Sequence, residues 1–90
     1  MNEFDPVLKE IIERLSGDWV VEDYQLAGMG WAAKIRKEQK LFTLHSERLW
    51  IDVYEDHFAD EKKILTSNKT TDIVTTLENT AANKSLLDNA

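Results

Sequence analysis

The pattern of apolar and polar positions divides the chain into a helical start, a long β-rich middle and a helical end. Between residues 6 and 16, apolar side chains recur every three or four positions with charged side chains opposite, the period of an amphipathic helix. Asp5 followed by Pro6 favours a helix start, because aspartate can accept from free amides and proline lacks the N–H that would need a partner. Gly17 supplies a stop. We therefore predict a helix over 6–16.

The next segment, 19–54, is rich in aromatic and β-branched residues, which favour strands. Breaks in this pattern predict four strands, at 19–26, 31–37, 40–45 and 48–54. We expect an antiparallel meander with a four-residue connection at 27–30 and two-residue turns at 38–39 and 46–47. Good helix formers fill 32–37, so a helix in that segment is the alternative.

The apolar positions test this pairing, because a one-residue slip would turn a whole strand over. With these turns Ile35 lies beside Phe42, Phe42 lies beside Ile51, and Ala33, Leu44 and Leu49 form a second apolar row. The first two strands add Val20, Tyr24, Leu26 and Trp31 to the same face. Glu22 also falls there, a misfit that a β-bulge, a sheet edge or an error in the pairing would explain.

A charged connection through Lys63 follows the meander, and 64–65 is a possible short edge strand. Thr70 or Thr71 can cap a final helix. Its inward residues would be Ile73, Val74, Leu77, Ala81 and Leu86, although Thr75 and Thr76 leave a strand over 72–78 as the alternative. The predicted fold is α+β, α-β-β-β-β-α, with both helices packing on the sheet. We expect one domain over 1–90, frayed at 1–4 and 88–90.

Composition and charge narrow the functional classes. The 90 residues leave room for one core, and the absence of cysteine removes disulfide and thiolate chemistry. No apolar run approaches the roughly 20 residues of a membrane helix and no signal peptide begins the chain, so we expect a cytoplasmic protein with no membrane partner. The net charge of −6 argues against nonspecific nucleic-acid binding, although 31–48 holds five basic and two acidic residues.

In this strand pairing one face of the sheet points away from the core. This face is polar and carries acidic, basic and aromatic side chains. Tryptophan, tyrosine and arginine often anchor protein interfaces. We predict a binding site there, with Asp23 close by, formed by Trp50, Asp52, Tyr54, Lys34, Arg36, His45 and Arg48. The alternative is that the C-terminal helix covers this face, with Trp50 and Tyr54 packed beneath it.

A non-enzymatic interaction module that engages another, larger protein is therefore the leading hypothesis. Small acidic inhibitors and regulators, such as immunity proteins, antitoxins and phage anti-defence proteins, share this size and charge, though no motif links them to this chain. One alternative is a nucleic-acid binder that uses the basic region 34–48, namely Lys34, Arg36, Lys37, Lys40 and Arg48.

Two further alternatives involve chemistry or self-association. The acidic run 52–61 and His57 contain the ligand types of a small metal-dependent enzyme, and Glu55 with Asp56 could form an acid–base pair. An open sheet edge could instead form a homodimer. We expect no metal and no cofactor, because 28–33 matches GxGxxA only as a lone motif in a chain too short for a dinucleotide fold.

Overall fold

The structure, a computed structural model, describes the backbone of residues 4–89 and the side chains of this range other than Ala27 and 83–89. The fraying expected at 1–4 and 88–90 and the inward position expected for Leu86 therefore fall mainly outside the described residues. The elements, in chain order, are α1 (Pro6–Arg14), β1 (Trp19–Ala27), β2 (Gly30–Lys37), β3 (Lys40–Glu47), β4 (Trp50–Glu55), the 3-10 helix η1 (Asp60–Lys62), β5 (Lys63–Ser67) and α2 (Thr70–Asn89).

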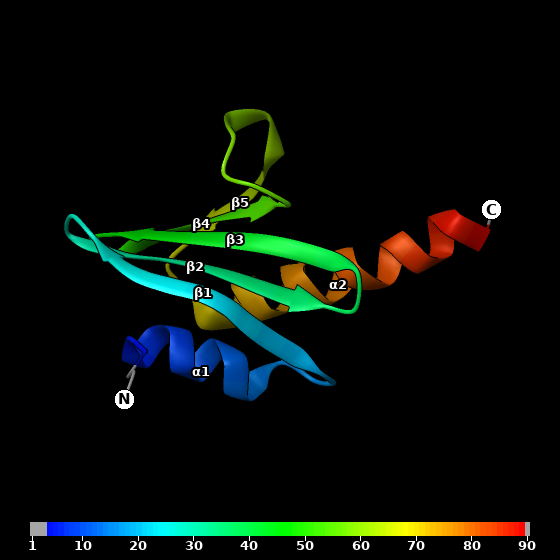
Figure 1. The fold of residues 1–90 in the computed structure, drawn as a ribbon, viewed down its shortest axis with the longest axis horizontal. Coiled ribbons are helices and arrows are strands. Elements are labelled where there is room, and N and C mark those ends of the chain that lie inside the picture. Colours follow the sequence, from blue (N-terminus) through cyan, green and yellow to red (C-terminus); the bar gives the residue numbers. More distant parts are fainter. Residues whose placement is uncertain (1–3, 90) are drawn as a thin grey trace.

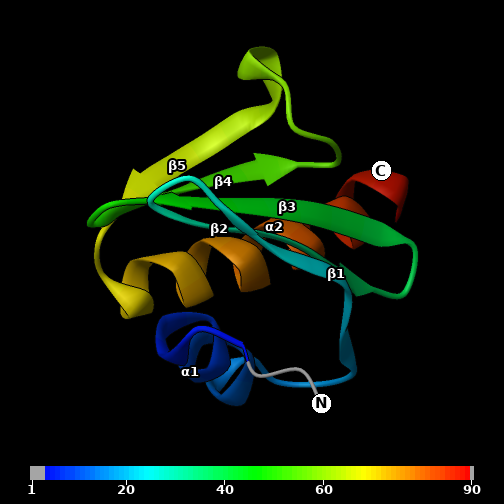
Figure 2. The same cartoon turned by 60° about the vertical axis from the view of Figure 1, so that its left-hand side comes forward.

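The elements form two layers, with one antiparallel sheet above and both helices below it (Figures 1 and 2). The strands follow one another in sequence order, β1-β2-β3-β4-β5. The α+β architecture is confirmed, but the prediction of four strands is wrong because β5 adds a fifth. This strand forms because Leu65, opposite Val53, packs against the core and Ser67, opposite Ile51, is buried.

Helix α1 begins as its sequence predicts. The Asp5 carboxylate accepts a hydrogen bond from the Val7 amide at 2.9 Å, and Pro6 occupies the first helical position. The helix ends at Arg14, and Gly17 continues the chain with a positive φ of 92° that favours glycine.

Helix α2 confirms a helix rather than a strand over 72–78, but the predicted cap is wrong. The helix starts at Thr70, and its first turn is held by Ser67. The Ser67 hydroxyl accepts from the Lys69 amide at 3.0 Å and donates to the Asp72 carboxylate at 3.1 Å. A buried serine at the end of β5 therefore fixes the chain where it enters α2 and contacts the first turn through Asp72.

The four strands of the meander are joined by three two-residue turns of one kind. These turns, at 28–29, 38–39 and 48–49, each place their first residue at positive φ: Gly28 at 55°, Glu38 at 57° and Arg48 at 59°. The turn at 38–39 is confirmed, whereas the turn predicted at 46–47 lies two residues later and the connection after β1 is two residues long. The alternative helix at 32–37 is wrong, because Trp31, Ala33 and Ile35 alternate inward as a strand requires.

The displaced turn changes the partners across β3 and β4 but not their faces. Ile35 lies opposite Phe42 as predicted, while Leu44 faces Val53 and Phe42 faces Glu55 rather than Ile51. The pairing has shifted by four residues, an even number, so each side chain keeps its side of the sheet. Leu49 lies in the turn and is 78% exposed, which contradicts its predicted place in the core.

A β-bulge between Val21 and Asp23 resolves the misfit at Glu22. The extra residue lets Val21, opposite Ile35, join the core face, whereas the predicted Val20 is 55% exposed. Glu22 pairs with Arg36 instead of entering the core. The bulge interpretation is therefore confirmed.

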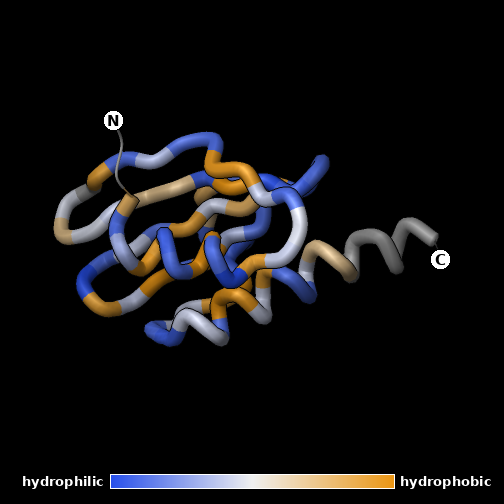
Figure 3. The backbone as a smooth tube through the Cα atoms, turned by 90° about the horizontal axis from the view of Figure 1, so that it is seen from below, coloured by the Kyte–Doolittle hydropathy of each residue, from blue (hydrophilic) through white to orange (hydrophobic). Residues whose placement is uncertain are grey.

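The core lies between the sheet and the helices. Figure 3, seen from below, shows apolar segments in the helices and in the strands alike. The fully buried side chains from the helices are Leu8, Ile11, Ile73 and Leu77, and those from the strands include Ile35, Phe42, Leu44 and Val53.

A polar contact joins the segment after α1 to α2 and predicts an acid-sensitive step. The Glu78 carboxylate accepts from the Ser16 amide at 2.8 Å and from its hydroxyl at 2.9 Å, and these bonds lower the pKa of Glu78. A carboxylate whose pKa is lower in the folded protein than its ordinary value of 4.5 stabilises the fold at every pH above 4.5. This stabilisation is lost as the pH falls through the lowered pKa of the folded protein. We expect Glu78→Gln to lower the unfolding free energy at pH 7 by roughly 0.5–1 kcal/mol.

The difference between the wild-type protein and Glu78→Gln should shrink below pH 4.5, as the wild-type carboxylate protonates. Urea unfolding of both proteins at pH 7 and at pH 3 measures this change. A pH-independent difference would show that the Glu78 charge does not stabilise the contact.

Candidate functional site

The sheet face opposite the core, here called the outer face, is covered by neither helix. Both α1 and α2 lie below the sheet and contribute to one core, while the segment that carries η1 rises on the other side (Figures 1 and 2). The alternative in which the C-terminal helix packs over Trp50 and Tyr54 is therefore wrong.

Two rows of paired residues cross the outer face. One row runs Asp23–Lys34–Thr43–Tyr54 and the next runs Gln25–Ala32–His45–Asp52. The structure thus brings together four of the seven predicted binding residues: Lys34, His45, Asp52 and Tyr54. It also adds Gln25 and Ala32 to their neighbourhood.

Tyr54 is buried beneath the segment that follows β4. The Phe58 ring contacts the Tyr54 ring with centroids 4.7 Å apart and the His45 ring at 5.2 Å, and Tyr54 is only 3% exposed. Burial, together with the charge of Asp52, raises the pKa of Tyr54 above its ordinary range. A partner would therefore meet Phe58, which is 58% exposed, before it met Tyr54.

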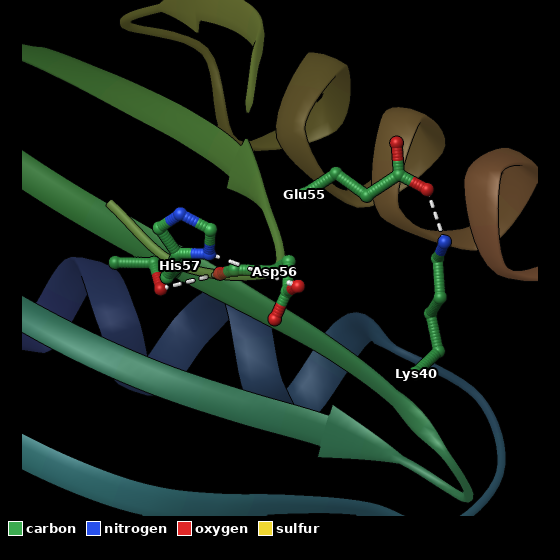
Figure 4. Close-up of polar contacts among 5 residues, drawn as sticks. Lys40, Glu55, Asp56 and His57 are labelled. Atoms are coloured by element: carbon green, nitrogen blue, oxygen red, sulfur yellow. Dashed lines mark hydrogen bonds and ion pairs between the residues drawn. The ribbon is translucent and has the colours of Figure 1, made fainter. Parts of the chain in front are cut away.

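Two hydrogen bonds to the backbone of Asp56 hold this segment on the outer face. The Asp56 amide donates to the Leu41 carbonyl at 2.8 Å, and the Thr43 hydroxyl donates to the Asp56 carbonyl at 2.7 Å. Asp56 itself has a positive φ of 76°, which turns the chain back over the sheet. In Figure 4 this contact lies apart from the Lys40–Glu55 ion pair beside the helices.

A cavity of about 230 Å³ opens beside Phe58 on the outer face, and we call it the outer pocket. Residues from β1, β2 and β3 line it together with the Phe58 ring. They include Asp23, Gln25, Ala32, Lys34, Thr43 and His45.

Of the other three predicted binding residues, Arg36 and Trp50 lie on the same face in the flanking rows, and Arg48 lies in a turn. Arg36 forms a two-point ion pair with Glu22, with Nη2 and Oε1 3.2 Å apart, and this contact lowers the pKa of Glu22. Arg48 lies in the turn between β3 and β4, and Trp50 follows that turn with 53% of its surface exposed. The predicted residues therefore share one face except for Arg48 at one end of the sheet, but Arg36 is paired with Glu22 and Tyr54 lies under Phe58.

The end of the sheet where Arg48 lies carries five of the eight large apolar side chains that are exposed in the described part of the chain. The β1–β2 and β3–β4 turns lie side by side there, close to the start of α1 (Figures 1 and 2). We define the hairpin end as Val7, Leu26, Met29, Leu49 and Trp50, which are between 41% and 78% exposed. Val7, Met29 and Leu49 line a groove of about 330 Å³.

Sequence reasoning assigned Leu26 and Leu49 to the core and gave Met29 no role. A signal was nevertheless present, because Met29 and Leu49 are large apolar residues at breaks between strands, where polar residues are usual. For Leu49 this signal was missed because the turn predicted at 46–47 placed the residue inside a strand.

The basic residues of the nucleic-acid hypothesis do not form one free surface. Arg36 is paired with Glu22 and Lys40 with Glu55. Lys37 donates to the Ser16 carbonyl at 3.3 Å and lies over the Trp19 ring. Arg48 is at the hairpin end, whereas Lys37 and Lys40 flank the turn at the opposite end.

The carboxylates of 52–61 point in different directions. Glu55 contacts Lys40 on the helix side, whereas Asp56 lies near His57, 3.7 Å from its Nδ1, on the other side (Figure 4). Asp52 accepts from the Thr66 hydroxyl at 2.5 Å. Among the described residues, no three histidine or acidic side chains gather as metal ligands would.

Comparisons with protein-family models, curated proteins and solved structures found no match to this chain. Within residues 4–89, neither helix is long and apolar enough to span a membrane. The functional inference therefore depends on the two surfaces described above.

Proposed function

We propose that this protein is a non-enzymatic interaction module that engages a larger protein through the hairpin end. The observation that carries the proposal is a difference between three turns of the same geometry. Their second residues are Met29, Gln39 and Leu49, so the turn itself does not require an apolar side chain. Exposed apolar groups that gather at one end of a small domain typically mark an interaction site.

The charge of the protein indicates the chemistry of the partner. Seventeen acidic residues against eleven basic ones give a net charge of −6, which favours approach to a basic surface. The partner we propose presents an apolar patch that accepts Met29, Leu49 and Trp50 and is bordered by basic side chains. By occupying such a patch the module would inhibit or regulate the partner.

The double variant Met29→Gln/Leu49→Gln tests this proposal, because Gln39 shows that the same turn position accepts glutamine. Capture from host lysate with quantitative mass spectrometry identifies the partner, and its affinity is then measured for each variant. We expect the double variant to lose at least about 30-fold in affinity, which corresponds to the loss of a single interface anchor worth roughly 2 kcal/mol. Rising salt should slow association of the wild-type protein.

Val20→Gln is the matched control, because Val20 is 55% exposed and lies opposite Arg36, toward the other end of the sheet. It should bind the partner as the wild type does. Unchanged binding by a folded double variant, or equal loss in the control, would contradict the assignment to the hairpin end. Tyr54 is unsuitable for this test because its substitution would disturb the packing under Phe58.

A further inference from the structure

The outer pocket exists because of a small residue on a crowded sheet face. Ala32 lies between Gln25 and His45, its registered partners on the two neighbouring strands. Side chains at such positions have Cβ atoms about 4.5–5.5 Å apart, so a methyl group between longer side chains leaves a hollow. Because the pocket floor is regular sheet, the hollow is fixed by the backbone.

The wall of the hollow is aromatic. Phe58 and His45 both line the pocket, and their rings lie 5.2 Å apart. The Thr43–Asp56 hydrogen bond secures the segment that carries Phe58. The volume of about 230 Å³ exceeds the roughly 150 Å³ of a cavity that holds benzene, so an aromatic ring with a short substituent fits.

Two opposite charges lie side by side at the same pocket. Asp23 and Lys34 are registered partners on β1 and β2, and both are exposed. Neither forms an ion pair with another residue in the described part of the chain, and Asp23 accepts only a long 3.5 Å contact from Gln25. The pair thus remains available to a ligand that carries an ammonium and a carboxylate.

We propose that the outer pocket binds a small aromatic zwitterion, the chemical class of the free aromatic amino acids. The ring lies beside Phe58 and His45 over Ala32, where aromatic neighbours favour it. The ligand carboxylate pairs with Lys34 and its ammonium with Asp23. This site is separate from the hairpin end and does not depend on the proposed partner.

The test uses two-dimensional amide NMR of the isotope-labelled protein titrated with free phenylalanine. We expect shifts confined to residues around the pocket and a dissociation constant on the order of 1 mM, as a dozen ligand atoms at modest efficiency imply. Phenethylamine lacks the carboxylate and hydrocinnamate lacks the ammonium. Each should bind roughly two- to fivefold more weakly, because each loses one solvent-exposed ionic contact.

Pocket variants locate the site. Ala32→Leu fills the hollow from the outer face and should abolish binding, whereas Val20→Leu adds a methylene group on the same face outside the pocket and should not change it. Lys34→Gln should reduce affinity for phenylalanine and leave that for phenethylamine unchanged. Asp23→Asn should likewise reduce affinity for phenylalanine and leave the affinity for hydrocinnamate, which has no ammonium group, unchanged.

Three outcomes would overturn the proposal. The first is that the amide NMR signals around the pocket do not shift when the phenylalanine concentration is tens of times the expected dissociation constant. A second is equal affinity for N-acetylphenylalanine amide, which would show that the pocket accepts an aromatic side chain within a polypeptide rather than a zwitterion. Retention of binding by folded Ala32→Leu would place the ligand elsewhere. None of these results bears on partner capture through Met29 and Leu49.

Discussion

Gly30→Ala is expected to lower the free energy of unfolding by at least about 3 kcal/mol, because the new methyl group has no space. A Cβ atom at Gly30 would lie 2.0 Å from the Ser46 carbonyl oxygen and 2.7 Å from its carbon. Both are backbone atoms of β3, the strand paired with β2, so neither can rotate away. Urea unfolding followed by circular dichroism measures the loss.

Gly28→Ala is the control for this prediction. A Cβ there would meet nothing within 4 Å, and the cost arises only from the positive φ of 55°. Such strain amounts to about 1–2 kcal/mol for a residue other than glycine. Equal stabilities of the two variants would show that the β2 and β3 backbones do not approach as closely as the structure places them.

These neighbouring glycines also show what the sequence could reveal. The requirement of Gly28 for positive φ follows from its place in a hairpin connection between two apolar runs, which the sequence pattern shows. The requirement at Gly30 depends on which residue of β3 lies opposite. The turn at 38–39 pairs Gly30 with Glu47, but the sequence pattern limited the two strands to 31–37 and 40–45 and so left both residues outside them.

The face of each strand was easier to predict than its partner. Alternating burial has a period of two, so an error of four residues in pairing leaves Leu44 and Ile51 on the core side. The same reasoning located the bulge at Glu22, because a charged residue at an inward position indicates an irregular strand. A fifth strand at 63–67 carries only a weak pattern of this kind, and its pairing depends on β4 being present.

The covering of Tyr54 could not be predicted in this way. Phe58 lies in a charged connection with no periodicity, so nothing local assigns it to a face. Its position depends on two hydrogen bonds of Asp56, which donates to the Leu41 carbonyl and accepts from the Thr43 hydroxyl, both more than a dozen residues away in the chain. Trp50 and Tyr54 were both expected to be exposed. Only Trp50 is, because Tyr54 lies beneath Phe58.

Strand length explains why the hairpin end exists. β2 and β3 each have eight residues, and with two-residue turns the turns recur every ten residues. Alternate turns of a meander lie at the same end of the sheet, so 28–29 and 48–49 come together while 38–39 lies opposite. Met29 and Leu49 thus form one surface although twenty positions separate them.

Phe42→Ala is the second variant with a large expected effect, a loss of about 3–5 kcal/mol. Phe42 is completely buried on the helix side of β3, with its ring 5.7 Å from that of Trp19. Deleting it leaves a cavity between the sheet and both helices. Because domains of this size are stabilised by about 5–15 kcal/mol in total, the variant should unfold at a markedly lower temperature.

Phe58→Ala removes the same atoms from the outer face and should cost about 1 kcal/mol, mainly the ring contacts with His45 and Tyr54. Thermal unfolding of both variants therefore measures which face of the sheet is the core. Similar losses would mean that the outer face is packed like the inner one. The outer pocket would then be closed to a ligand, whereas the hairpin end, formed by the turns, would be unaffected.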